Sequence, residues 1–266
     1  MTFLQAFFLG AVQGITEFLP VSSSAHLVIL EQLLEISSPE KVFDVFLNMG
    51  TLLVIVIFFR RQICDLLQGV IDFLWGKNTE NRFFFLTILL SSLPTIIIGG
   101  VLETVFNTDA ISKTVLFGSM ILFSIVLYIC DRSPTQKRNI SRTDSMLVGL
   151  AQSLAFIPGV SRLGICLSMM RYLKYSREES FHHAMILSLP PILGACCLKL
   201  IKILGRGASI EDWQMVAVGS FSAFLFGLPT LFLITKFLQK HSLLLIIFYR
   251  FALGLTLLAR HLELFN

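Results

Sequence analysis

A chain of 266 residues in which 55% of the side chains are hydrophobic and only 14% are charged is too apolar to be a typical soluble domain. Its formal net charge of +4 is spread over short segments, which argues against a nucleic-acid partner. These features predict an integral membrane protein with no nucleic-acid role.

A polar segment interrupts the apolar sequence near the N-terminus. It runs from Gln13 to His26 and contains a carboxylate, three consecutive serines and an imidazole. Unpaired polar groups cost roughly several kcal/mol each in hydrocarbon, so these side chains must face water or one another. The apolar flanks are residues 3–19 and 27–35, and the second would be only about 13 Å long as a helix. We therefore expect a re-entrant helix-loop-helix hairpin.

Pro20 is expected to end the first helix of this hairpin, because proline removes a backbone donor and restricts the residue before it. The serines that follow are Ser22, Ser23 and Ser24. One of their hydroxyls is expected to cap the second helix by accepting hydrogen bonds from its free N–H groups.

Six longer apolar segments can each cross about 30 Å of hydrocarbon. They are residues 43–59, 83–105, 114–130, 182–201, 214–235 and 243–263. Residues 63–75 instead show the three-to-four spacing of an amphipathic helix at the membrane interface. Pro190-Pro191 is expected to kink the fourth span. The basic residues of the segment 132–142 place that loop in the cytoplasm by the positive-inside rule.

A second polar segment, residues 158–162, follows the apolar residues 144–157 and precedes a short apolar stretch that ends at Leu173. At an offset of 139, Gln13 and Ser22 align with Gln152 and Ser161. We interpret the chain as a single membrane domain made of two weak internal repeats. The repeats span residues 1–131 and 140–266.

The predicted fold is an all-α polytopic membrane protein with six full transmembrane helices and two re-entrant hairpins. If the basic loop is cytoplasmic, the three spans of the first half cross the membrane in the directions out-in, in-out and out-in. The three spans of the second half cross it in the opposite directions. The two hairpins would therefore enter from opposite faces and meet near the midplane, in an inverted repeat.

Arg162 lies at membrane depth in this scheme, where a charged side chain costs about 2.5 kcal/mol or more unless it has a partner. A phosphate-bearing substrate is one candidate partner, because the guanidinium matches phosphate oxygens in pairs. Backbone N–H groups near Gly159 and Ser161 would add donors for the same anion. Glu17 is the other candidate, in a purely structural ion pair. The sequence leaves both interpretations open.

Ser23 and His26 are three residues apart, so a hydroxyl and an imidazole can approach on one helical face as a nucleophile and its base do. Serines after a proline are also common helix caps, and a lone histidine is often a satisfied polar group. Glu17 is a candidate to hold a divalent cation, to orient His26 or to neutralise Arg162. Their spacing does not separate these roles.

The two polar segments resemble the motifs of the bacterial undecaprenyl pyrophosphate phosphatases, the bacitracin-resistance type of integral membrane enzyme. The first family motif has Glu or Gln, then Glu, then a Phe-Leu-Pro-Val-Ser-Ser run that ends in His. Gln13, Glu17, residues 18–23 and His26 reproduce it. The second motif reads Pro-Gly-x-Ser-Arg-Ser-x-x-Thr, and residues 158–162 match its first part.

Other positions agree with the family only in part. Leu163 and Cys166 stand where the family motif has Ser and Thr, so two hydroxyls that would bind phosphate are missing. Asn48 stands where the family often has His or Gln, and Tyr249-Arg250 in the last span also resembles family positions.

The resemblance implies hydrolysis of undecaprenyl pyrophosphate to undecaprenyl phosphate and inorganic phosphate. This reaction would take place on the outer (periplasmic) side of the bacterial plasma membrane, recycling the lipid carrier for cell-wall synthesis and giving bacitracin resistance. The resemblance also implies a divalent cation, Mg2+ or Ca2+, and a homodimer surrounded by membrane lipids.

The same resemblance implies roles for individual residues. Arg162 would bind phosphate, and Glu17 would support the metal or the histidine. Ser23 and His26 would provide the nucleophilic step, with the attacking group left open. The further substrate-binding positions are Gln13, Ser22, Gly159 and Ser161.

A polyprenyl-phosphate transporter or flippase is the alternative function, because inverted repeats with broken helices are typical of secondary transporters. A transporter needs Arg162 and Glu17 for binding, but it has no need of a nucleophile beside a histidine. The sequence therefore favours the enzyme.

Overall fold

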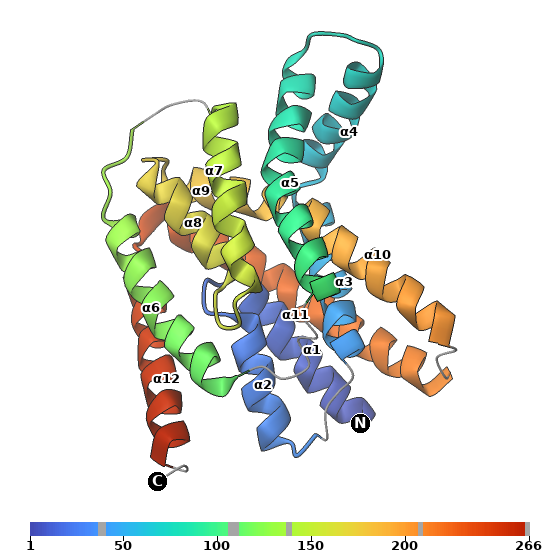
Figure 1. The fold of residues 1–266 in the computed structure, drawn as a ribbon, viewed down its shortest axis with the longest axis vertical. Helices are drawn as coiled ribbons and strands as arrows, with labels where there is room; N and C mark the ends of the chain where they lie inside the picture. Colours follow the sequence, from blue (N-terminus) through green and yellow to red (C-terminus); the bar gives the residue numbers. More distant parts are fainter. Residues whose placement is uncertain (37–40, 106–111, 137–139, 207–209, 264–266) are drawn as a thin grey trace.

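The computed structural model describes residues 1–36, 41–105, 112–136, 140–206 and 210–263, and the regular elements of these ranges are all helices (Figure 1). In chain order they are α1 (Phe3–Glu17), α2 (Ser23–Leu33), α3 (Lys41–Phe58), α4 (Arg60–Leu74), α5 (Glu80–Val105), α6 (Lys113–Asp131), α7 (Arg142–Gln152), the 3-10 helix η1 (Ser153–Phe156), α8 (Arg162–Tyr172), α9 (Arg177–Leu187), α10 (Leu189–Arg206), α11 (Ile210–Lys240) and α12 (Leu244–Glu263). The predicted all-α class is confirmed.

Helices α1 and α2 form the first predicted hairpin. A capping box between Thr2 and Gln5 starts α1, which ends at Glu17, three residues before Pro20. Residues 19–21 make a tight turn around Pro20, in which the Val21 N–H donates to the Leu19 carbonyl (2.8 Å). Helix α2 has 11 residues and is therefore only about 16 Å long, too short to cross a bilayer.

The second hairpin consists of α7, η1 and α8. A capping box between Ser141 and Asp144 starts α7. The predicted helix over 144–157 is shorter than expected, because the chain tightens into η1 after Gln152. Helix α8, again with 11 residues, starts after the N-cap Ser161.

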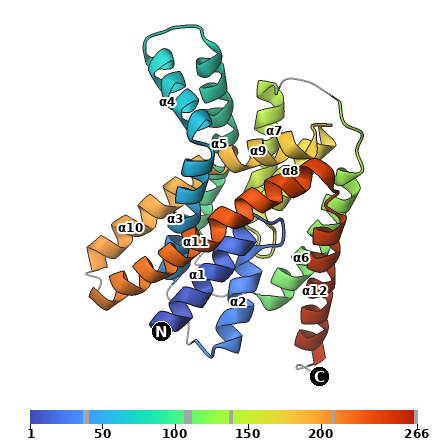
Figure 2. The ribbon, with the colours of Figure 1, turned by 180° about the vertical axis from the view of Figure 1, so that it is seen from behind.

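The two hairpins enter the molecule from opposite ends, and their tips meet in the middle (Figures 1 and 2). Helix α1 starts at the end that carries both termini, whereas α7 starts at the end from which the α4–α5 pair projects. This arrangement agrees with the predicted scheme. The exact number of six spans and two re-entrant hairpins stays a prediction.

Five helical segments are long and apolar enough to cross a membrane among the residues that the structure describes. They are Glu80–Leu102, Lys113–Asp131, Arg177–Leu198, Trp213–Lys240 and Leu244–Glu263. The first predicted span, 43–59, corresponds to α3. Its apolar helical part is the shorter segment Phe46–Phe58. The chain is therefore a multi-pass membrane protein.

The fourth predicted span, 182–201, is not one continuous helix. A turn at Ser188 separates α9 from α10, and the two helices diverge from there (Figure 1). The predicted kink at Pro190-Pro191 is therefore confirmed. Proline is tolerated in the first turn of a helix, where its missing N–H has no intrahelical role, so Pro190 favours a new helix here.

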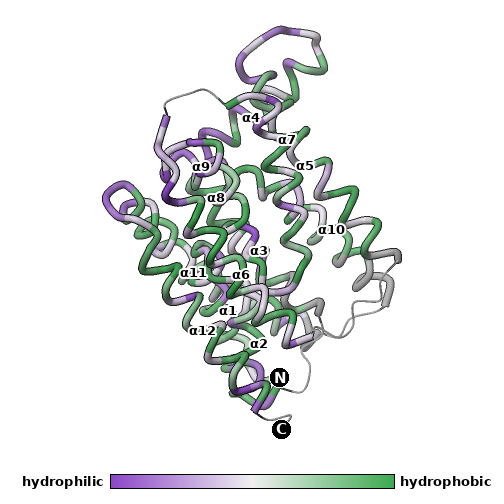
Figure 3. Tube along the Cα trace, turned by 60° about the vertical axis from the view of Figure 1, so that its left-hand side comes forward, coloured by the Kyte–Doolittle hydropathy of each residue, from purple (hydrophilic) through white to green (hydrophobic). Residues whose placement is uncertain are grey.

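The predicted amphipathic helix 63–75 is α4, which packs against the start of α5. In Figure 3 the turn between them is hydrophilic, whereas the longer helices are largely hydrophobic. The basic loop that follows α6 is described only in part. Lys137 and Arg138 lie outside the described residues.

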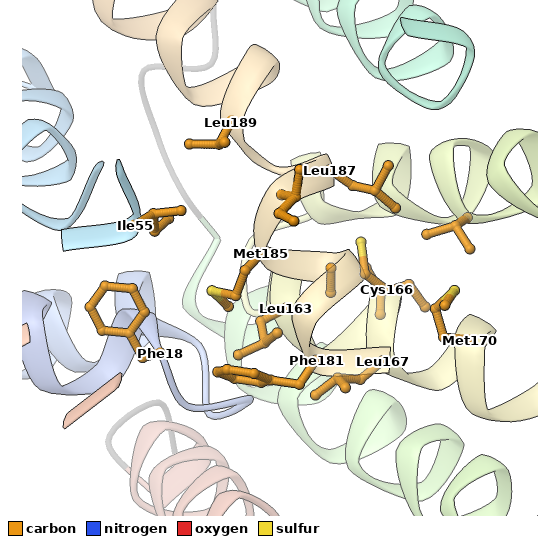
Figure 4. Close-up of a cluster of buried hydrophobic side chains, with 14 of the residues drawn as sticks. Phe18, Ile55, Leu163, Cys166, Leu167, Met170, Phe181, Met185, Leu187 and Leu189 are labelled. Atoms are coloured by element: carbon orange, nitrogen blue, oxygen red, sulfur yellow. The ribbon is translucent and has the colours of Figure 1, made fainter. Parts of the chain in front are cut away.

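The largest buried cluster surrounds α8 and α9 (Figure 4). Cys166, Leu167 and Met170 of α8 have no exposed surface, and Phe181 of α9 is 1% exposed. Phe18, at the tip of the first hairpin, joins the same cluster. Helix α8 is thus enclosed by protein, the condition under which a short helix and irregular backbone are tolerated at membrane depth.

Each hairpin packs against a long helix from the other half of the chain. Helix α1 lies on α11, α7 lies on α5, and α6 and α12 run side by side. Gly10 of α1 and Gly149 of α7 face the backbone of their partner helices closely, so that a side chain at either position would collide with a carbonyl. Positions 10 and 149 are also separated by the offset of 139, and the two glycines have the same packing role.

Candidate active site

Helices α2 and α8 begin at the same cavity, which has a volume of about 510 Å³. Its wall contains Ser22, Ser23, Ser161 and Arg162, from the starts of the two helices. The first turn of a helix has N–H groups without intrahelical partners and carries a partial positive charge. Two such helix starts at one cavity form a site suited to an anion.

The two helix starts are capped differently. The Ser161 hydroxyl accepts from the Gly164 N–H (3.1 Å) and so caps α8. The expected serine cap of α2 is wrong, because the N-cap residue Ser22 has a φ of +73° and its hydroxyl pairs instead with that of Ser24 (3.2 Å). A positive φ is unfavourable for serine and is held in place by surrounding structure, often at functional sites. The first N–H groups of α2 are left to water or a ligand.

A buried arginine, Arg250 of α12, connects the two hairpin tips. Its Nη1 donates to the Pro20 carbonyl (3.2 Å) and its Nη2 to the Gly159 carbonyl (3.0 Å). The side chain is completely buried, and no carboxylate lies within 4.0 Å of it among the described residues. Its positive charge therefore adds to that of the helix starts.

Gly159 adopts a φ of +91°, and a side chain at this position would collide with the Leu116 carbonyl and the Ser119 hydroxyl. The Ser119 hydroxyl donates to the neighbouring Pro158 carbonyl. Glycine is thus required by the backbone here. Gly159 is absent from the cavity wall, so it shapes the tip of the second hairpin instead of lining the site.

Glu17 is the carboxylate at the cavity, and three side chains donate to it. Arg162 forms an ion pair with its Oε1 across the two hairpins. The Ser23 hydroxyl (2.8 Å) and the Gln13 amide (3.0 Å) donate to Oε2. The same Gln13 amide donates to Asn48 Oδ1 of α3 (2.9 Å), which also lines the cavity. The structure thus brings together Glu17, Ser23, Arg162 and Gln13.

His26 is placed differently from the expectation that it pairs with Ser23. Its Nδ1 contacts the Ser22 carbonyl and its Nε2 the Tyr249 hydroxyl, both at 2.8 Å. The rings of His26 and Tyr249 also stack, with centroids 5.8 Å apart. The Ser23 hydroxyl turns to Glu17 because the carboxylate is the stronger acceptor.

The residues at the two positions that lack the family hydroxyls belong to the protein core. Leu163 is 5% exposed, and Cys166 is completely buried. The Cys166 thiol donates to Gln152 Oε1 (3.5 Å), and the Gln152 amide donates to the Thr95 hydroxyl of α5 (3.1 Å). Thr95 and Gln152 both line the cavity, so polar groups are still present on this side.

The sequence signals for these residues differ. Gln152 aligns with Gln13 at the offset of 139, whereas Thr95 lies in an apolar segment, and only the fold brings both to the cavity. Arg250 had two signals: Tyr249-Arg250 resembles family positions, and a basic residue inside the apolar segment 243–263 needs a partner.

The donor set suits a hard divalent cation. Glu17 supplies a carboxylate, and Asn48 and the serines supply neutral oxygens, the ligands that Mg2+ and Ca2+ prefer. Among the described residues, no group of three or more His, Cys, Asp and Glu side chains converges on one point. A cation here would therefore depend on Glu17 together with oxygens of a bound phosphate, as Mg2+ commonly does.

Comparison with known proteins gives a single family. A family model described as bacitracin resistance protein BacA matches residues 6–256. A protein of Erythrobacter litoralis named undecaprenyl-diphosphatase is 32% identical, over 97% of this chain and 99% of its own. Proteins of the same name from a Nocardioides species (35% identical, over 95% of this chain and 94% of its own) and from Elusimicrobium minutum (34%, over 97% and 98%) are similar over almost their whole lengths.

Proposed function

Because the chain belongs to the bacitracin resistance protein BacA family, we propose that it hydrolyses undecaprenyl pyrophosphate to undecaprenyl phosphate and inorganic phosphate. One observation carries the proposal. Two helix starts and the guanidinium of Arg162 meet at a cavity where the Ser23 hydroxyl lies 2.8 Å from the Glu17 carboxylate. An anion site and an activated hydroxyl at one place are what phosphoryl transfer requires.

Binding of the pyrophosphate would change the partner of Arg162. In the structure its guanidinium forms an ion pair with Glu17. The two phosphate groups carry more negative charge than one carboxylate, and their oxygens match the guanidinium in pairs. Arg162 would therefore turn to the terminal phosphate and leave Glu17 free to accept a proton.

Ser23 is the better placed nucleophile of the two candidates, because it lines the cavity and donates directly to Glu17. Its oxygen attacks the terminal phosphorus while its proton passes to Glu17. The bond from that phosphorus to the bridging oxygen breaks, and undecaprenyl phosphate leaves. Water then hydrolyses the phosphoserine, releases inorganic phosphate and regenerates the Ser23 hydroxyl. Arg162 and the N–H groups at the starts of α2 and α8 stabilise the charge that develops on the phosphate oxygens.

His26 has a positioning role in this scheme. Its ring lies between the Ser22 carbonyl and the Tyr249 hydroxyl, and it does not line the cavity. It holds Ser22 in its unusual backbone conformation and so directs the neighbouring Ser23 toward Glu17. A divalent cation, Mg2+ or Ca2+, bound by Glu17 and the phosphate oxygens would neutralise charge on the substrate.

The cavity is proposed to open toward the outer side of the bacterial plasma membrane. Arg132 after α6 and the basic residues of the α4–α5 and α8–α9 turns support this orientation, because these segments lie toward one end of the molecule (Figure 1). A homodimer is proposed only from the family resemblance, and the mass of the purified protein in detergent tests it.

The test of the function is phosphate release in detergent by the purified protein, with undecaprenyl pyrophosphate as substrate. We expect multiple turnovers without any ion gradient, abolished by Ser23→Ala. A transporter would release no phosphate under these conditions, and that result would refute the proposal.

A further inference from the structure

The cavity has a polar part and an apolar part. Glu17, Arg162 and the serines form the polar part, described above. The apolar part is formed by α5, η1 and α10, with these residues in its wall: Ile96, Gly99, Gly100, Ala155, Phe156, Gly194, Ala195 and Leu198. A ligand with an anionic head and a hydrocarbon tail fits such a division.

The hydrocarbon tail of the proposed substrate is too large to remain inside. A cavity of about 510 Å³ lies within the range of pockets that enclose drug-sized ligands, roughly 300–1,000 Å³. An undecaprenyl chain has 55 carbons, and the pyrophosphate occupies part of the space. Most of the tail must therefore leave through the wall into the bilayer.

Two glycines from different helices line the apolar part. An added Cβ at Gly100 of α5, or at Gly194 of α10, would meet no atom within 4 Å, so both helices border open space at these points. Both helices also expose apolar side chains nearby, with Ile96 47% and Leu198 56% exposed. The path from the polar part across the two glycines therefore leads to hydrocarbon.

A second apolar groove, of about 590 Å³, is lined by α3, α10 and α11. Its wall includes Met49, Leu200 and Trp213, and it shares no residue with the wall of the active-site cavity. The groove is therefore a less direct path for a tail whose head is bound at Glu17.

We propose that the polyprenyl tail leaves the cavity between α5 and α10, and that the missing side chains at Gly100 and Gly194 set the width of this passage. The inference rests on the proposed phosphatase function and names the part of the cavity that selects for the tail. A branched side chain at either position narrows the passage without touching the polar part.

The test compares a long and a short substrate. Gly100→Leu and Gly194→Leu should each raise KM for undecaprenyl pyrophosphate roughly tenfold or more, the effect of a misfitting group in a tight apolar site. Dimethylallyl pyrophosphate, whose tail is a single isoprene unit, should be hydrolysed as by the unmodified protein. Gly118→Leu is the matched control, because an added Cβ there also meets no atom within 4 Å and Gly118 lies outside the cavity wall. An equal change in KM for both substrates, or no change for the long one, would refute the proposed passage.

A second measurement does not depend on turnover. A polyprenyl pyrophosphate with a photoreactive group in its tail is crosslinked to the Glu17→Gln protein, and the labelled peptides are identified. Label on α5 and α10 supports the passage even if the unmodified protein releases no phosphate, which would refute only the phosphatase function. Label on Met49 or Trp213 would place the tail in the other groove and overturn the inference.

Discussion

In the proposed mechanism Arg162 and Glu17 each have two roles, because the ion pair that links the two hairpins must separate when substrate binds. The structural ion pair and the phosphate clamp, which were alternatives in the sequence, are compatible in the structure. The pair is only partly shielded from solvent, with 24% of the Arg162 side chain exposed, so exchange of partners needs little rearrangement. The ion pair would contribute to stability and the phosphate contact to turnover, so the two roles can be measured separately.

Arg162→Lys separates these contributions. Lysine keeps the charge but loses the planar fork that matches phosphate, so kcat should fall by roughly 100-fold or more while thermal stability changes little. A double-mutant cycle with Glu17→Gln, scored for melting temperature in detergent and for phosphate release, measures the coupling. Near-normal turnover by Arg162→Lys with strong stability coupling would show that the arginine only joins the hairpins.

Glu17→Gln tests the carboxylate itself. It removes the proton acceptor of Ser23 and the charged ligand for a cation, so we expect loss of most activity and of most stimulation by Mg2+ or Ca2+. Glu178→Gln serves as the control, because this carboxylate lies in the first turn of α9 and bonds Gln239 instead of a cavity residue. Full, metal-stimulated turnover by Glu17→Gln would mean that the carboxylate is structural.

At the scale of elements, α12 holds two hairpins that otherwise belong to different halves of the chain. Arg250 joins the turn after α1 to the turn before α8 through two carbonyls, and Tyr249 holds His26. The sequence predicted the two hairpins well, because short apolar flanks and proline are local signals. It did not predict how they are joined, because Arg250 comes some 90 residues after Gly159 and 230 after Pro20 in the chain.

Arg250→Met should therefore destabilise the protein and disorder both hairpin tips. Each buried carbonyl that loses its donor costs about 1–3 kcal/mol, and the fall in melting temperature should be accompanied by loss of turnover. Arg250→Lys keeps the charge but reaches fewer acceptors, so an intermediate melting temperature is expected. If Arg250→Met has the melting temperature and turnover of the unmodified protein, the hydrogen bonds from Arg250 to the two hairpins do not contribute to stability.

The contact between α4 and α5 predicts a pH dependence. Hydrogen bonds from Thr79 (2.6 Å) and Gln68 (3.0 Å) hold the pKa of the Asp72 carboxyl below its ordinary value of 3.8. A lowered carboxyl pKa stabilises the folded protein above the ordinary pKa, and this stabilisation is lost as the pH falls through the folded-state pKa. The difference in melting temperature between the unmodified protein and Asp72→Asn should therefore shrink in acid. A difference that does not depend on pH would contradict this assignment.

At the scale of the whole molecule, the prediction from sequence succeeded where local patterns decide the structure and failed where packing decides it. Hydropathy located the long apolar helices of the described residues, and Pro190-Pro191 predicted a kink in the fourth span, but neither signal placed the turn at Ser188. The pairing of Ser23 with His26 followed from helical spacing alone. A carboxylate from the preceding helix competed for that hydroxyl, and sequence spacing contains no information about it. The two internal repeats stay a prediction, which the equivalent packing of Gly10 and Gly149 supports.

Membrane orientation is a further prediction at this scale. In a background without the native cysteines, a single cysteine at Gln32, near the end of α2, should react with an impermeant reagent from outside. Cysteines at Lys77 and Gln136 should react only after permeabilisation, because both positions are exposed at the end that carries the basic loops. External labelling of either would reverse the proposed orientation.

The crossed packing of the hairpins also has a consequence for biosynthesis. Helix α1 leaves the ribosome long before α11 and α12, yet its most extensive contact is with α11, and the arginine that fixes its tip is in α12. Contacts this distant in the chain cannot form until α12 has been translated, and they are slow to close. The polar turn of the first hairpin must meanwhile stay in contact with water or with the insertion machinery. A chain that stops before α12 therefore carries both polar segments and still lacks the arginine that joins them, so the proposed active site cannot assemble.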